Sequence, residues 1–231
     1  MRVSRLASAP NWRNAIGEIV LIVVGVTIAL AGTSWYEDRA LRSEEIRVLR
    51  QIGQSLEEDY RTLLEQSERL NRFSNAGRQL YDFLRSAEPV SENITPLFNS
   101  INGVAPLELR TAPFEALKSR GFDLISDESL RIELIELYDD LYERAERNVT
   151  QDTEWVHERI RPYLMEQFLR DPSDSWIPKD LDEVRASGYL ANLCKMRAFS
   201  LDEYTLQSMR RAVDGNRRVS QTINEILNRS D

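Results

Sequence analysis

The sequence predicts an all-α protein. We expect an N-terminal transmembrane helix that continues into a long stalk helix, and an antiparallel bundle of three or four long helices plus short helices. Residues 19–36 are eighteen consecutive positions without a formal charge. After them, apolar residues recur at spacings of about 3.5 to 3.6, as on one face of a helix. No alternating run is long enough to predict a strand of useful length.

The uncharged stretch has the length of a transmembrane helix, because about 18 apolar residues cross the hydrocarbon core of a bilayer. Trp12 and Trp35 flank it, and tryptophan favours the headgroup level at both interfaces. The 23 residues between these tryptophans correspond to roughly 34 Å of helix at about 1.5 Å per residue. Such a helix spans a bilayer with modest tilt.

The charges near the N-terminus predict the topology. Three arginines and no acid precede Glu18, and basic flanks stay on the cytoplasmic side. We therefore expect a single-pass protein of the bacterial inner membrane. Its expected parts are a cytoplasmic tail at 1–14, a transmembrane helix at 15–36 and a periplasmic helical-bundle domain at 37–231.

A cleavable signal peptide is the alternative interpretation of the same segment. Ala29-Leu30-Ala31 has the small-x-small form that signal peptidase recognises. Glu18 lies where the core of a signal peptide begins, however, and the apolar stretch continues past this position to Trp35. These two features favour a retained helix, and both interpretations place the large domain outside the cytoplasm.

Composition narrows the classes of protein that this chain can be. The 231 residues are 42% hydrophobic and 29% charged, which suits one exported domain of ordinary size. Residues 37–231 hold 27 basic and 37 acidic residues, a net charge of 27 − 37 = −10. An acidic domain is poorly suited to nucleic acid. Cys194 is the only cysteine, so no disulfide can form within the chain.

The stalk is predicted from residues 37–72, which contain no proline and have one apolar face. Because nothing breaks the pattern after Tyr36, the membrane helix should continue directly into it. Four leucines fall seven residues apart, a register that could pair with a helix of the same chain or of a neighbour. Asp59 and Gln66 interrupt this face, which favours packing within the chain. The four leucines are Leu49, Leu56, Leu63 and Leu70.

Shorter elements follow the stalk. Residues 74–86 are expected to be helical and to end before Pro89. The segment 93–109 contains two prolines and a glycine, which predicts short helical turns and loop. Thr111-Ala112-Pro113 should start a new helix, and Gly121 should end it.

The second half of the chain has two long helical patterns. The first is capped by Ser126 or Asp127 and contains Pro162, where we expect a kink because proline removes a backbone donor. The turn-rich segment 171–178 interrupts the pattern. The last helix should begin at Ser200, whose spacing to Glu203 fits a capping box.

No residue is assigned to catalysis, to a cofactor or to a metal. His157 is the only histidine, and Glu154 lies three residues before it, as in di-iron helix bundles. Such a site needs two Glu-x-x-His motifs, so His157 is more simply an exposed helix residue beside solvated glutamates. No Gly-x-Ser-x-Gly elbow or phosphate-binding glycine loop is present in the sequence.

Cys194 and two acidic clusters also allow a functional and a structural interpretation. The adjacent Lys195 could lower the thiol pKa of Cys194, but a small buried core residue is favoured. Residues 57–59 and 139–140 could bind a cation, although neither lies in a loop of calcium-binding form. We expect both clusters to be solvated faces of helices.

Glu18 is the ionisable residue at the start of the apolar stretch. It is six residues from Trp12, roughly 9 Å along a helix, so its carboxyl group could reach the headgroups. Alternatively it contacts another helix, because Glu18 shares one face with small residues that let membrane helices approach closely. This candidate intramembrane interface consists of Glu18, Gly25, Ala29 and Gly32.

Two stretches of the sequence carry a resemblance to a known family. They are the anchor with Gly17-Glu18, residues 25–30 and residues 35–39, and the later segment from Phe114 to Tyr138. Together they resemble an uncharacterised family of bacterial single-pass membrane proteins, a domain of unknown function with an N-terminal anchor and a helical periplasmic domain. Tyr36 stands where asparagine is frequent in that family. The resemblance implies topology and no activity, ligand or catalytic residue.

Three functions are compatible with these observations. The first is a non-enzymatic, membrane-anchored envelope protein that binds a partner or scaffolds a complex. Its expected partners are the lipid bilayer and either a second copy of the chain or another membrane or periplasmic protein. The second is a periplasmic small-molecule sensor or accessory bundle acting through a separate membrane partner. The third is an enzyme without a recognised motif.

Overall fold

The computed structural model describes residues 12–87, 89 and 94–229, and describes no side chain for residues 12–20 and 28–34. Two compact units divide the chain, Met1–Arg47 and Val48–Asp231, and each is described by itself. The described residues are mostly helical, which confirms the all-α class. We refer to residues 48–231 as the bundle.

The first unit contains the N-terminal part of α1, a helix assigned from Trp12 to Arg85 without a break at Tyr36. The predicted transmembrane helix lies in this part. Of the helices, as far as they are described, none is both long and apolar enough to cross a membrane. Side chains 21–27 and 35–40 are exposed. Most of the predicted cytoplasmic tail, residues 1–11, lies outside the described residues.

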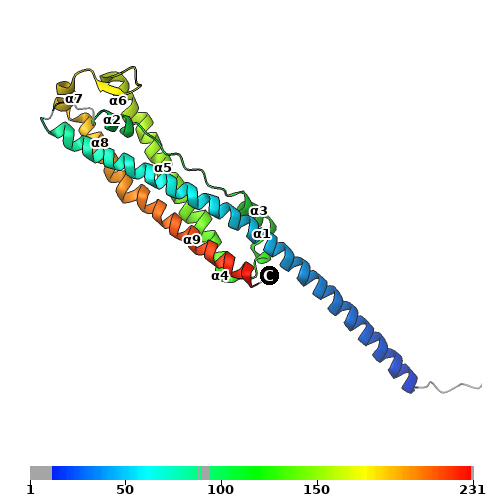
Figure 1. Ribbon diagram of the computed structural model, residues 1–231. Helices are drawn as coiled ribbons and strands as arrows, with labels where there is room; N and C mark the ends of the chain where they lie inside the picture. Colours follow the sequence, from blue (N-terminus) through cyan, green and yellow to red (C-terminus); the bar gives the residue numbers. More distant parts are fainter. Residues whose placement is uncertain (1–11, 88, 90–93, 230–231) are drawn as a thin grey trace, which may run out of the picture. The chain divides into compact units, whose positions relative to one another are not determined.

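The bundle has three long helical columns (Figure 1). The first is α1 from Val48 onward. The second comprises α4 (Glu128–Glu136), the π-helix η2 (Leu137–Tyr142), α5 (Glu143–Trp155), the π-helix η3 (Val156–Ile160) and α6 (Arg161–Gln167). The third comprises α8 (Tyr189–Ser200), the π-helix η4 (Leu201–Thr205) and α9 (Leu206–Asn228). Short elements complete the bundle: α2 (Thr95–Ile101), α3 (Ala112–Arg120), the 3-10 turn η1 (Phe122–Leu124) and α7 (Leu181–Ser187).

The directions of the columns differ from the antiparallel expectation. The α8–α9 column runs antiparallel to both others, but α1 and the α4–α6 column run parallel (Figure 1). An extended crossover, residues 103–111, makes this possible by returning along the bundle between α2 and α3. Side chains of α1 hold the crossover at both ends. Arg69 donates to the Val104 carbonyl at 3.4 Å, and Asp59 accepts from the Arg110 amide at 2.9 Å.

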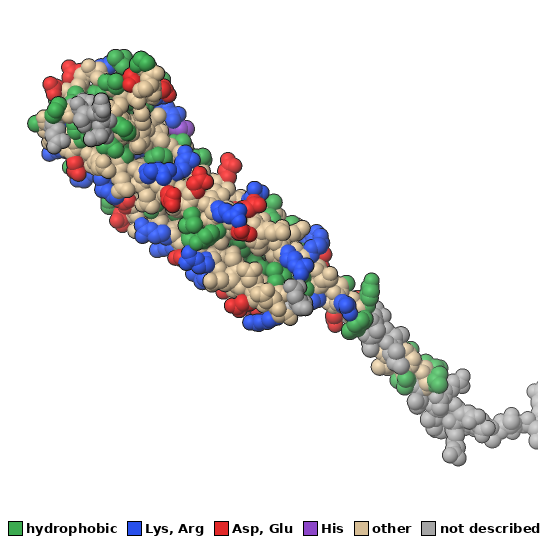
Figure 2. All heavy atoms as spheres, viewed as in Figure 1, with side chains coloured by type: hydrophobic (Ala, Val, Ile, Leu, Met, Phe, Trp, Pro, Cys, Tyr) green, Lys and Arg blue, Asp and Glu red, His purple; other side chains and the backbone are tan. Residues whose placement is uncertain are grey.

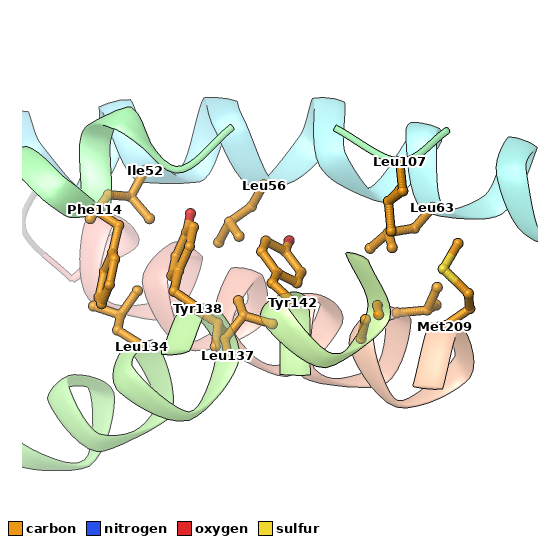
Figure 3. Close-up of a cluster of buried hydrophobic side chains, with 14 of the residues drawn as sticks. Ile52, Leu56, Leu63, Leu107, Phe114, Leu134, Leu137, Tyr138, Tyr142 and Met209 are labelled. Atoms are coloured by element: carbon orange, nitrogen blue, oxygen red, sulfur yellow. The ribbon is translucent and has the colours of Figure 1, made fainter. Parts of the chain in front are cut away.

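The bundle core forms two apolar clusters. The larger one includes all four heptad leucines of α1, which are buried inside this chain, as the sequence favoured. Tyr138 and Tyr142 extend from η2 into it, with their hydroxyl groups directed towards α1 (Figure 3). The smaller cluster packs α2, α6 and α7 against the end of α1 and the start of α8. On the face shown in Figure 2, acidic and basic side chains are interspersed, as on a solvated surface.

Several predicted helix limits are confirmed. The Asp127 carboxylate caps α4 by accepting from the Leu130 amide at 3.0 Å. α3 ends before Gly121, whose φ of 104° is a conformation that residues with a Cβ rarely adopt. α1 ends at Arg85, upstream of Pro89. Pro162 lies at the start of α6 and follows η3, a π-helical segment that accommodates its missing donor. The kink expected at Pro162 stays a prediction.

One prediction about the second half of the chain was wrong, and one short element was not predicted. Ser200 does not cap a helix: it lies inside the third column with helical angles and makes no capping bond. Its buried face continues from Ala198 to Leu201, and this packing determines the continuation across the local motif. The turn-rich segment also takes part in a short antiparallel sheet of β1 (Phe168–Arg170) and β2 (Trp176–Pro178), which sequence analysis did not predict.

Candidate functional site: a groove between α5 and the α8–α9 column

A groove follows the boundary between α5 and the α8–α9 column. It consists of two adjoining hollows, of about 670 and 520 Å³, which share Gln151, Ser200 and Tyr204 in their walls. The larger hollow is lined by arginine and polar side chains, and the smaller one is mostly apolar. We call this site the arginine–aromatic groove. Besides the shared residues, its defining side chains are Arg144, Arg147, Arg211, Glu203, Trp155, Lys195, Met196 and Phe199.

The arginine end of the groove carries three guanidinium groups. Arg144 pairs with Asp140 at 2.6 Å and Arg147 approaches Glu143 at 3.7 Å, in both cases one turn earlier on the same column. All four of these side chains are about half exposed or more, so such pairs contribute little to stability. Arg211 reaches the same hollow from α9. A ligand carboxylate could therefore replace the intrahelical partners at small cost.

The aromatic end exposes three large apolar side chains. Met196, Phe199 and Tyr204 are 57%, 58% and 59% exposed. The rings of Phe199 and Tyr204 meet edge to face with centroids 6.1 Å apart. In an ordinary α-helix two residues five apart lie on different faces, but η4 has π-helical bonding, with the Leu206 amide donating to the Leu201 carbonyl. The π-helix thus brings these two rings together.

A buried ion pair forms the base of the aromatic end. The Arg197 guanidinium donates to Asp152 through Nε at 2.9 Å and Nη2 at 2.8 Å, and both side chains are almost fully buried. It also donates to the carbonyls of Ile101 at 2.5 Å and Gly103 at 2.8 Å. Because the pair is bidentate and further hydrogen-bonded, its charges are compensated without solvent. Its main role is therefore to join α5, α8 and the start of the crossover.

Hydrogen bonds across the groove fix the spacing of its walls. Asn148 on α5 donates through Nδ2 to the Tyr204 carbonyl at 3.4 Å and to the Ser208 hydroxyl at 3.1 Å. Ser208 in turn donates to the Thr205 carbonyl at 2.7 Å. The groove is thus a formed feature of the packed bundle, because these bonds join its two walls.

A second polar group is buried in the centre of the bundle. Asp59 is 1% exposed, and Oδ2 of its carboxylate has no hydrogen-bond partner among the described residues. Burial raises the pKa of Asp59 to about 6. Burial also raises the phenol pKa values of Tyr138 and Tyr142, with the Asp59 charge as a second cause. Asn216 donates to the Tyr142 hydroxyl at 2.6 Å and to the Leu56 carbonyl at 2.8 Å.

Only part of the predicted intramembrane interface lies among the residues whose side chains the structure describes. The side chains of Glu18, Ala29 and Gly32 lie outside the described residues. At Gly25, an added side-chain methyl would meet no atom within 4 Å. The interface therefore stays a prediction.

The other sequence-based candidates have clear positions. His157 and Glu154 are exposed, and Asp139 and Asp140 form a solvated face, as expected. Cys194 is fully buried and its thiol pKa is raised to about 12 by that burial. Asp59 contradicts the expectation for its cluster, because it points into the core while Glu57 and Glu58 are solvated. No group of three potential metal ligands occurs among the residues that the structure describes.

The groove is not apparent from the sequence. Its residues come from four elements, α5, α8, η4 and α9, and share no motif. One signal was available in retrospect, because Trp155, Phe199 and Tyr204 are large aromatic residues at positions outside the buried stripe of their helices. Their convergence depends on η4, and π-helical segments cannot be recognised from apolar spacing alone.

Comparisons with protein-family models, curated proteins and solved structures give no match to this chain. Function therefore has to be argued from the groove itself. The groove provides guanidinium donors, apolar surface and shaped space, while its buried carboxylate, Asp152, is neutralised by Arg197. These are the properties of a binding site.

Proposed function

We propose that this chain is a non-enzymatic, membrane-anchored binding module of the bacterial envelope. In this proposal residues 15–36 span the inner membrane, residues 1–14 are cytoplasmic and residues 37–231, which include the bundle, are periplasmic. The uncharged stretch 19–36 and the arginines before it support the anchor. The resemblance to single-pass membrane proteins with helical domains supports the same topology.

The arginine–aromatic groove is the observation that supports the binding function. Three large apolar side chains are more than half exposed in it, and a contiguous exposed apolar patch on a soluble surface often marks an interaction site. The bundle interior, by contrast, is filled by two apolar clusters. A partner protein would therefore bind on the surface of the bundle, at the groove, while the anchor holds the complex at the membrane.

A small-molecule sensor is the second candidate, because one observation favours it. The arginine-lined hollow, at about 670 Å³, lies within the range of small-ligand sites and converges several polar groups. A sensor of this kind would have to act through a separate membrane protein. We rank it second because the hollow is continuous with a long, open apolar surface, which exceeds the needs of a small anion.

The anchor and the topology can be tested together. We expect the full chain to remain in the membrane fraction after alkaline extraction, and a periplasm-active reporter fused to its C-terminus to be active. A cytoplasm-active reporter at the same position is the matched control. A silent periplasmic reporter with an active cytoplasmic one would contradict the topology.

Partner binding has a separate test. Crosslinking and affinity purification of the intact protein from membranes should recover a second protein. We expect Glu18→Leu to reduce this recovery if the intramembrane face contributes to the contact. Recovery of the chain alone, with the same result for Glu18→Leu, would exclude the partner hypothesis in this form.

A further inference from the structure

We propose that the arginine–aromatic groove binds an amphipathic, acidic α-helix of a partner protein. This inference rests on the proposed function and adds the chemistry of the partner. It follows from three properties of the groove: its length, its apolar end and its charge.

The length of the groove suits a short helix. From Arg144 to Trp155, α5 advances eleven residues, roughly 16 Å at about 1.5 Å per residue. This corresponds to three turns of a bound helix. Two packed antiparallel helices leave a groove in which a third helix can lie with its side chains between theirs. Recognition of an amphipathic helix in such a groove uses apolar anchors at i, i+3 or i+4, and i+7.

The apolar end defines one face of the partner helix. Trp155 comes from α5, while Met196 and Phe199 come from α8 and Tyr204 from η4, so both walls offer apolar surface. The buried Asp152–Arg197 pair below adds no uncompensated charge. Aliphatic or aromatic anchors of the partner would therefore remove apolar surface from water on both helices.

The charge of the groove defines the other end of the partner. Arg144, Arg147 and Arg211 line one hollow together with Glu203, and Arg144 and Arg147 are paired with the exposed carboxylates of Asp140 and Glu143 one turn earlier. Because such exposed pairs contribute little, acidic side chains of a partner could replace these carboxylates at the guanidinium groups. Arg147 and Arg144 lie 8 and 11 residues from Trp155 along α5, which is roughly 12 to 16 Å. The partner should carry its carboxylates two to three turns from its apolar anchors.

The polarity of the bound helix follows from the same charges. Acidic residues are most favourable in the first turn of a helix, where they complement the macrodipole. An N-terminal acidic turn of the partner would lie at the arginine end and its anchors at the aromatic end. The partner helix would then run parallel to α5.

The test is site-specific photocrosslinking in the intact chain in native membranes. A benzoylphenylalanine replaces Gln207 at the arginine end or Phe199 at the aromatic end, and the crosslinked peptides are sequenced by mass spectrometry. Asn224, in the separate hollow between α1 and α9, is the matched control position. We expect one partner segment with helical apolar spacing, whose acidic N-terminal part crosslinks at position 207 and whose apolar part crosslinks at position 199.

Charge reversal supplies the second measurement. Arg147→Glu combined with Arg211→Glu should lower the crosslinking yield at position 199 at least tenfold. The matched control, Arg50→Glu with Arg217→Glu at the α1–α9 hollow, should leave the yield within twofold. Far-UV circular dichroism of both double variants checks that the bundle is folded.

Several results would overturn the inference. They are a basic partner segment, the reversed polarity, crosslinks to a second copy of this chain, adducts of lipids or small molecules only, and equal loss in both double variants. Crosslinks to a partner from position 224 alone would overturn the groove assignment but leave the proposed binding function intact. Absence of a protein partner from all three positions would overturn both.

Discussion

Asp59 is a carboxylate whose pKa the fold raises by burying it in the core. On α1 it occupies a core-facing position between Leu56 and Leu63, and among the described residues its carboxylate accepts only the Arg110 amide from the crossover. Ionisation of this group costs free energy in the folded state, because the buried charge loses its hydration. The crossover is thus held by a carboxylate whose charged form is unfavourable in the apolar core. Glu146, which accepts the Leu109 amide at 3.1 Å, has its pKa raised by burial in the same way.

Asp59→Asn should stabilise the bundle at neutral pH. The pKa of Asp59 is about 6 in the folded state and about 3.9 when unfolded, so the folded state binds the proton more tightly. The stabilisation that comes from the tighter proton binding of Asp59 in the folded state is fully present below about pH 4 and is lost as the pH rises through 6. Two pKa units correspond to about 3 kcal/mol. We expect the variant to gain up to that amount at pH 7 and little at pH 4.

The measurement is urea unfolding of both proteins between pH 4 and 7.5. Glu57→Gln, which removes an exposed carboxylate from the same helix, is the control for a change in net charge. An Asp59→Asn variant that is less stable than the parent at pH 7 would contradict the interpretation.

At the scale of elements, the crossover at 103–111 decides the topology. It has no regular secondary structure of its own, and side chains from all three helical columns hold it in place. Gly103 lies at the point where the crossover passes α1. A side-chain methyl at this position would come within 2.4 Å of Cε1 of Phe73. The Phe73 ring also lies 5.2 Å from the Arg197 guanidinium carbon, so this contact is linked to the buried ion pair. The π-helix η4 similarly determines the aromatic end of the groove, because it brings the rings of Phe199 and Tyr204 together.

Gly103→Ala should therefore destabilise the bundle by about 1–3 kcal/mol, the usual cost of overpacking. Gly53→Ala is the matched control, because its new methyl would meet Ile223 at an ordinary 3.6 Å. Within a helix, replacing glycine by alanine should leave the free energy of unfolding unchanged or raise it by up to about 1 kcal/mol. Thermal and urea unfolding of the two variants measure the difference. Equal stabilities would show that the approach of the crossover to Phe73 is not tight.

At the scale of the whole molecule, the bundle contains its own core. Both apolar clusters consist of residues from Val48 onward, as far as side chains are described. Residues far apart in the sequence join the second and third columns. Asn216 on α9, for example, donates to the Tyr142 hydroxyl on η2. Stability therefore belongs to residues 48–231, and the N-terminal stretch is not needed to complete either cluster.

A chain of residues 40–231 should fold independently. We expect a helical far-UV spectrum and one cooperative thermal transition, because a single domain with its own core unfolds as a unit. Cys194 reports the same transition, since its buried thiol should react with a thiol reagent only after unfolding. A broad transition, or rapid reaction of Cys194 in the native state, would contradict this prediction.

Local sequence signals were enough to predict the helical class, several helix limits and the burial of the leucine register. These features follow from local signals: apolar spacing, capping side chains, proline and glycine. Tertiary structure decided the parallel direction of two columns, the position of Asp59 and the arginine–aromatic groove. Each of these depends on contacts between residues far apart in the chain, and the groove also depends on a π-helical shift that no local spacing encodes. The proposed anchor follows from local sequence signals, whereas the proposed binding surface exists only in the packed bundle.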